Sequence, residues 1–249
     1  MQLMAPWVPA FTNSVNRHLE SFPFVTLSFA TVDCEGRPKV RTCIYRGFLF
    51  NDRRTNVLTI TSDTRMDKIE HLKSNSQVEA CFWFPKTNEQ FRVSGHAHTL
   101  TSDNAEKFSD EVDYPLVSPG AIKNYSSNMD LASMGQMTNN TSERNDIKPT
   151  AQEWKDEMDS KWDALSGKLK ASFRKPEPGS KITPEKRKLL DSITRGVDGS
   201  NEEDGKKNYS LVVLTVDKVD YINLNGHNDI RYLYERFDED QWTEDEVCP

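Results

Sequence analysis

Long apolar runs are missing from this 249-residue sequence, and no stretch approaches the roughly 18 apolar residues that a membrane-spanning helix needs. Pro6 and Trp7 stand where a signal peptide would have its apolar core. Basic stripes are also missing, and the net charge of -7 would repel a nucleic-acid backbone. We therefore expect a cytoplasmic protein, with access to the nucleus by diffusion, that binds neither membranes nor nucleic acid.

Paired cysteine motifs are absent as well. The four cysteines occur singly, without a C-x-x-C pair or the spacing of a metal site, at Cys34, Cys43, Cys81 and Cys248. Reduced thiols are the expected state of each, and no metal site is predicted. The histidines are scattered and form no recognisable Ser-His-Asp set. The sequence therefore assigns no catalytic residue.

Short segments of alternating apolar and polar residues dominate what is present. They predict strands over residues 25–32, 39–48, 57–60, 78–84, 91–100, 209–216, 219–224 and 230–237. Apolar residues every four positions from Trp7 to Leu19 predict an amphipathic helix that Pro6 opens. Antiparallel strands joined by tight turns, with helices added, indicate a mainly β fold of the α+β class, built on a small barrel.

The second half of the chain predicts helices inserted into the same domain. Residues 118–148 lack any period and are expected to form a mobile insertion, whereas 196–208 reads as a solvated linker. A helical stripe of apolar residues should pack against the barrel, and it comprises Trp154, Met158, Trp162, Leu165, Leu169 and Phe173. A further helix should begin at Thr183 and Pro184, with three residues facing inward, Leu189, Leu190 and Ile193. The acidic finish is expected to be a solvated surface held by Trp242 and Val247, so residues 1–249 form a single domain.

The junction after the strand at 57–60 carries the strongest chemical signal. Thr61 and Ser62 supply hydroxyl donors, and a short helix should follow with Arg65 and Lys68 on one face. Unpaired N–H groups and the dipole at a helix N-terminus favour anions, so this junction predicts a phosphate site. The alternative is an ordinary surface helix capped by Asp63. Three residues of the helix should face inward, namely Met66, Ile69 and Leu72.

Several motifs occur in an order that resembles a known family. They are Pro6-Trp7, Arg41-Thr42, Arg46-Gly47-Phe48, the 61–68 junction, Trp83, the segment 89–95, the Trp154 to Gly179 section and Val219-Asp220-Tyr221. Together they resemble a little-characterised branch of the pyridoxamine 5'-phosphate oxidase-like FMN-binding split barrels. The resemblance implies a six-stranded antiparallel split β-barrel that binds FMN. It also implies a homodimer with FMN at the two-fold interface.

The resemblance further implies which residues contact FMN. Arg41 would lie near the phosphate, and Arg46 would flank the flavin site on the same strand. The flavin ring would lie along the backbone of Thr42, Cys43 and Ile44. The phosphate contacts would come from Thr61, Ser62, Arg65 and Lys68, the set that the junction itself predicts. Gln90 would reach the ring, and Arg231, or its neighbour Tyr232, would add a contact from near the C-terminus.

One departure from the family bears on the substrate. The oxidases bind the substrate phosphate with an Arg-x-His triplet, whereas this chain has Asn228-Asp229-Ile230 there. Without the cation and the imidazole, the charge-assisted hydrogen bonds to a dianion are lost, which argues against pyridoxamine phosphate. Three hypotheses follow: an FMN-dependent oxidoreductase acting on an unidentified small substrate, a flavin-binding protein without turnover, and a barrel that lost flavin and serves as an interaction module.

Overall fold

The computed structural model describes residues 4–122, 148–224, 226, 229–238 and 241–249. Its strands are β1 (Thr26–Val32), β2 (Pro38–Phe48), β3 (Val57–Asp63), β4 (Gln77–Phe84), β5 (Glu89–Leu100), β6 (Tyr209–Asn223), β7 (Ile230–Arg236) and β8 (Trp242–Val247). Its α-helices are α1 (Trp7–Leu19), α2 (Asp67–Ser74), α3 (Phe108–Glu111), α7 (Ala151–Asp163), α8 (Gly167–Ser172) and α9 (Pro184–Arg195). Three 3-10 helices complete the order, η1 (Leu49–Asn51), η2 (Arg53–Thr55) and η3 (Glu202–Asn208).

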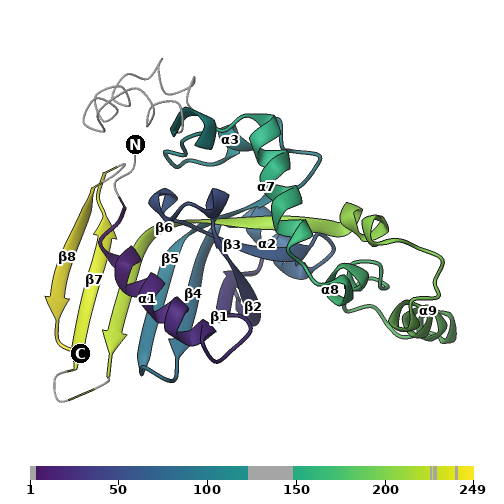
Figure 1. Cartoon of the computed structure of the whole chain (residues 1–249), viewed down its shortest axis with the longest axis horizontal. Helices are drawn as coiled ribbons and strands as arrows, with labels where there is room; N and C mark the ends of the chain where they lie inside the picture. Colours follow the sequence, from purple (N-terminus) through teal and green to yellow (C-terminus); the bar gives the residue numbers. More distant parts are fainter. Residues whose placement is uncertain (1–3, 123–147, 225, 227–228, 239–240) are drawn as a thin grey trace.

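The strands form one antiparallel sheet in the order β3-β2-β1-β4-β5-β6-β7-β8, and pairing of β3 with β6 closes its first six strands into a barrel. This confirms the expected six-stranded barrel. β7 and β8 extend the sheet beyond the closure point (Figure 1). The expected solvated surface held by Trp242 and Val247 is confirmed, since the four residues between them are exposed and these two are half-buried. The strand itself was not predicted: β8 pairs along its whole length with β7.

β6 is one continuous strand where the sequence predicted two. Its pairing with β5 shifts by one residue, so that Asp217 bulges between Val216 and Lys218. A Cβ on Gly95 of β5 would lie 1.9 Å from the Thr215 carbonyl oxygen, so only glycine fits there. The bulge lets one long strand pair with β3 at one end and with β7 at the other.

The barrel interior is filled from α1. Phe11 is fully buried, and its ring packs edge-on against Phe82 of β4, Phe91 of β5 and Tyr45 of β2, with centroids 4.9, 5.3 and 5.6 Å away. The expected helix over residues 7–19 is confirmed, and Trp7, Phe11 and Val15 of its apolar stripe pack on this core. Leu19, the last residue of the expected stripe, is exposed instead.

A second core joins β6 to α7 and α8. We call the chain from α7 to α9 the helical section. Trp154, Met158 and Trp162 of α7 pack with Tyr209 and Leu211, as the apolar stripe predicted. The stripe is divided between two helices, α7 and α8, because Ser166 begins a new helix by accepting a hydrogen bond from the Leu169 N–H.

Other expectations need correction. Met66 and Leu189 were expected to face inward, but they are 38% and 43% exposed. The range 196–208 is more than a solvated linker, since it contains η3, whose Gly205 is buried against α8. Of the expected insertion 118–148, residues 123–147 lie outside the described part of the chain. None of the described helices has the length and apolar character needed to cross a membrane.

Candidate functional site

A pocket of about 490 Å³ lies between β2, β3 and the segment that follows α8, a volume typical of small-molecule sites. From the barrel it is lined by Thr42, Cys43, Ile44, Arg46, Thr61, Ser62, Asp63, Met66 and Lys68. The helical section contributes Leu169, Ser172, Phe173, Ile182, Leu190 and residues 175–180. We call it the β2–β3 pocket. Seven of the eleven predicted cofactor residues line it, namely Thr42, Cys43, Ile44, Arg46, Thr61, Ser62 and Lys68.

Lys68 is the most unusual group of the β2–β3 pocket. Its side chain extends from the first turn of α2 and is buried, with 6% of its surface exposed. The ammonium nitrogen donates to Ser62 Oγ at 2.9 Å and contacts Met66 Sδ at 2.7 Å, and among the described residues it forms no ion pair. Burial lowers the pKa of Lys68, mainly by desolvation. A buried ammonium without a paired carboxylate is costly, and an anion in the pocket would relieve that cost.

Arg46 supplies a second cation beside the pocket. Its Nε donates to Thr61 Oγ1 at 3.3 Å, and burial lowers its pKa. The pairing of β2 with β3 shifts at this point, so that Arg46 and Gly47 together lie opposite Thr59. Gly47 adopts a φ of +96°, which side-chain-bearing residues rarely tolerate. Such bulges commonly redirect a side chain beside a binding site, and this one accompanies Arg46 at the β2–β3 pocket.

Two of the predicted phosphate contacts, Arg41 and Arg65, do not line the pocket. Arg41 donates to the Phe29 carbonyl oxygen at 3.1 Å and to Thr31 Oγ1 at 2.8 Å, and its charge lies close enough to lower the pKa of the lining residues Lys68 and Cys43. Arg65 precedes α2, which begins only at Asp67, so it does not share a helix face with Lys68. The guanidinium of Arg65 is bound in bidentate fashion by Asp63, at 2.8 and 2.6 Å. The alternative that Asp63 caps α2 is also wrong, since the N-cap is Met66.

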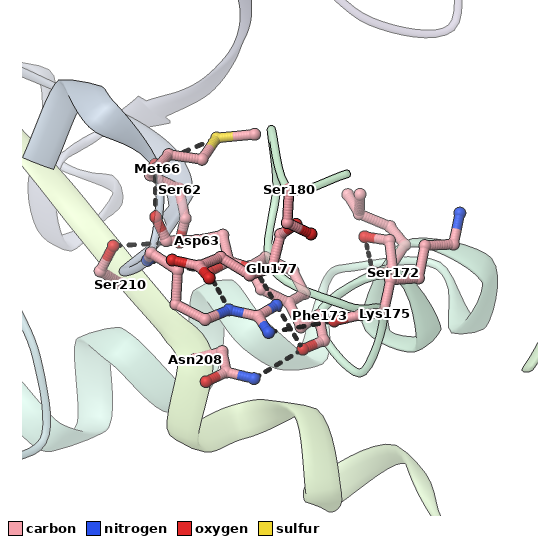
Figure 2. A network of polar contacts seen from close by, with 12 residues as sticks. Ser62, Asp63, Met66, Ser172, Phe173, Lys175, Glu177, Ser180, Asn208 and Ser210 are labelled. Atoms are coloured by element: carbon pink, nitrogen blue, oxygen red, sulfur yellow. Dashed lines mark hydrogen bonds and ion pairs between the residues drawn. The ribbon is translucent and has the colours of Figure 1, made fainter. Parts of the chain in front are cut away.

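Arg65 and Asp63 instead belong to a polar network that links the end of β3 to the segment after α8. Figure 2 shows Asp63 in this network together with Phe173, Lys175 and Asn208. Arg65 donates to the carbonyl oxygens of Lys175 at 3.0 Å and Phe173 at 3.2 Å. Asn208 Nδ2 also donates to the Phe173 carbonyl oxygen, at 2.8 Å. These bonds hold Phe173 and the following turn as one wall of the β2–β3 pocket.

We did not predict from the sequence that Phe173 and the turn after it would form one wall of the pocket. The sequence placed Phe173 in a core stripe, and the structure shows it both in the second core and on the pocket. Ile182 and Leu190 also line the pocket and had no predicted role there. The available signal was the Pro176 to Gly179 break, since a break directly after an apolar stripe commonly marks a loop returning over the body of the protein.

Gln90 and Arg231 lie far from the β2–β3 pocket. Gln90 is on β5, which is three strands from β2 in either direction around the six-stranded barrel and therefore opposite it. In register, Gln90 faces Ile222 of β6, which faces Arg231 of β7. Asp220 binds Arg231 Nε and Nη2 at 2.9 and 2.8 Å. Tyr232 packs against the barrel core, so of the two neighbours it is Arg231 that shares a face with Gln90.

Comparison with known proteins shows the family to which the chain belongs. The family model described as "Pyridoxamine 5'-phosphate oxidase, FMN-binding domain" matches residues 4–101. An uncharacterised protein of Saccharomyces cerevisiae, YGR017W, is 36% identical and aligns over 99% of both chains. The chain belongs to the pyridoxamine 5'-phosphate oxidase-like FMN-binding family.

Two further proteins are similar to this chain, one over its whole length and one over part of it. A pyridoxamine 5'-phosphate oxidase-related, FMN binding protein of Nostoc punctiforme is 25% identical, covers 100% of both chains and superposes with a TM-score of 0.69. Pyridoxine/pyridoxamine 5'-phosphate oxidase 2 of Arabidopsis thaliana is 36% identical over 106 residues, which span 42% of this chain and 51% of that protein. The chain therefore has the split barrel of the pyridoxamine 5'-phosphate oxidase-like family.

Proposed function

We propose that this protein binds FMN in the β2–β3 pocket and acts as an FMN-dependent oxidoreductase on a small substrate. The proposal rests on the buried Lys68 ammonium, whose hydrogen-bonding partners within the described part of the chain, Ser62 and Met66, are both neutral. Phosphate oxygens accept charge-assisted hydrogen bonds from such a group more strongly than neutral acceptors do. Family membership supports FMN as the phosphate-bearing ligand.

One set of pocket residues suits the phosphate of FMN, and another suits its ring system. Ser62, Thr61, Lys68 and Arg46 supply hydroxyl and cationic donors for the phosphate. A flat apolar ring system would contact the side chains of Ile44, Leu169, Phe173, Ile182 and Leu190. When bound, FMN supplies hydride or electron transfer, and the protein supplies its orientation and electrostatic surroundings. Replacement of the Arg-x-His triplet by residues 228–230, of which Asn228 lies outside the described residues, favours a substrate without a phosphate dianion.

We also propose a homodimer. Gln90 and Arg231 lie on the opposite side of the barrel from the β2–β3 pocket, so they reach a flavin only in a second copy. Trp83, directly opposite Gln90 on β4, is 47% exposed on the same face, as expected of a surface covered by a partner. Sedimentation should give twice the chain mass, and Gln90→Ala should weaken FMN binding. A monomer that binds FMN, unaffected by Gln90→Ala, would refute this arrangement.

The proposed phosphate contact predicts a pH dependence. Burial lowers the pKa of Lys68, so the free protein loses this charge at a lower pH than an exposed lysine would, and FMN must then bind with uptake of a proton. FMN affinity should therefore fall as pH rises from neutral to about 10, by at most about tenfold per pH unit. In Lys68→Arg the guanidinium stays charged and the profile should be flat. An unchanged slope in Lys68→Arg would assign the titration to another group, such as the neighbouring Cys43 thiol.

We place this activity in the cytoplasm. All four cysteines are free, two of them exposed, which suits a reducing compartment.

Turnover is tested separately from binding. The reduced holoprotein should be reoxidised by oxygen or by a candidate acceptor faster than free FMN is. Equal rates would favour a flavin-binding protein without turnover.

A further inference from the structure

The bulge that carries Arg46 is held from outside the strand pair. Between Arg46 and Asn51 the chain turns sharply, with Gly47 at φ +96°, Phe50 at +54° and Asn51 at +55°. Left-handed backbone is unfavourable for residues with a side chain, so the corner persists only if surrounding contacts impose it. From β3, Thr59 Oγ1 donates to the Gly47 carbonyl oxygen at 2.8 Å. The other contacts come from α7, more than a hundred residues later in the chain.

Lys161 of α7 directs its three N–H donors at this corner. Its Nζ donates to the carbonyl oxygens of Arg46 at 3.1 Å and Phe48 at 3.2 Å, and to Asn51 Oδ1 at 2.8 Å. An ammonium has three protons, so these bonds use all of them. The side chain is 5% exposed, and these acceptors replace the water it has lost.

Glu157, one turn earlier on α7, completes the contact. Its Oε1 lies 3.4 Å from Lys161 Nζ and accepts the Phe50 N–H at 3.0 Å. Burial raises the pKa of Glu157 and lowers that of Lys161, so each charge depends on the other. A buried pair of this kind adds little stability over an apolar pair but fixes one arrangement of the groups it touches.

We propose that Lys161, supported by Glu157, is a positioning residue for the cofactor site: it holds the β2 bulge in the conformation that presents Arg46 to the β2–β3 pocket. This inference rests on the proposed function, because it takes Arg46 as a ligand of the FMN phosphate. In this proposal α7, which lies outside the barrel, affects the affinity for FMN without contacting FMN.

A double-mutant cycle on the full-length protein tests the inference, with FMN affinity measured by quenching of flavin fluorescence. Arg46→Ala and Lys161→Met should each weaken FMN about tenfold, whereas Lys161→Met added to Arg46→Ala should cause less than about a twofold further loss. Lys170→Met is the matched control, since Lys170 is a buried lysine of α8 paired with Glu202 that makes no hydrogen bond to β2. Lys170→Met should leave FMN affinity within about twofold of wild type.

A milder variant covers the case in which Lys161→Met does not fold. Asn51→Gly keeps the left-handed backbone but removes one acceptor of Lys161, and it should weaken FMN by about two- to threefold. Additive losses in the cycle, or equal losses in Lys161→Met and Lys170→Met, would overturn the positioning role while leaving the FMN site intact. Wild-type affinity in both Arg46→Ala and Lys68→Met would instead refute the FMN site itself.

Discussion

Lys68→Met should weaken FMN binding by about tenfold or more, the equivalent of about 1.5–3 kcal/mol for one charge-assisted hydrogen bond. Methionine keeps most of the apolar volume of the lysine stem, so the variant removes the ammonium and its bond to Ser62 Oγ with little change in packing. Fluorescence titration of the apoprotein with FMN measures the effect.

Riboflavin is the matched ligand control, because it has the same ring system without the phosphate. The affinity for riboflavin should be nearly the same in Lys68→Met and in wild type, so the preference for FMN over riboflavin should shrink in the variant. Equal losses for both ligands would mean that Lys68 supports the shape of the pocket and does not bind the phosphate.

Trp162→Ala should lower the free energy of unfolding by about 3–5 kcal/mol, the range for deleting a large buried aromatic side chain. Trp162 is fully buried, and its ring packs against Tyr209 and Phe173 with centroids 5.1 and 5.5 Å away. Its Nε1 also donates to Glu203 Oε1 at 3.2 Å. The side chain therefore joins α7, the turn after α8 and β6, and its loss leaves a cavity behind one wall of the β2–β3 pocket.

Chemical denaturation followed by circular dichroism measures this effect. Phe237→Ala provides the control, since Phe237 is 64% exposed and its truncation should cost less than about 0.5 kcal/mol. If Trp162→Ala unfolded at the same denaturant concentration as Phe237→Ala, the helical section would contribute no stability to the barrel.

The phosphate end of the site could be predicted from the sequence because it is local. Ser62 and Lys68 are six residues apart, and a strand that leads into a helix brings hydroxyl and cation together without help from distant segments. Arg65 lies in the same stretch, but its partners could not be predicted, because some of them come from distant segments of the chain. Asp63 binds it, and carbonyl groups of Phe173 and Lys175, more than a hundred residues away, accept two further hydrogen bonds from its guanidinium. Sequence spacing carries no information about such distant acceptors.

In the fold, too, local features could be predicted from the sequence and features that depend on distant contacts could not. Alternation predicted barrel strands such as β1 and β4, because each of these has one buried and one more exposed face. It missed β8, whose residues Thr243 to Glu246 are exposed on both faces and so give no period. The bulge at Arg46 and its brace from Lys161 depend on contacts between β2 and α7, which no local pattern records. Which side of the barrel Gln90 occupies likewise follows only from the strand order.

The most direct test of the account is the visible absorption spectrum of the freshly purified protein, with mass analysis of what heat releases. We expect flavin bands and close to one FMN per chain, and the chain stripped of flavin should regain both on addition of FMN. A colourless protein that also fails to bind added FMN would contradict the proposed site in the β2–β3 pocket, and the split barrel would then be better explained as an interaction module.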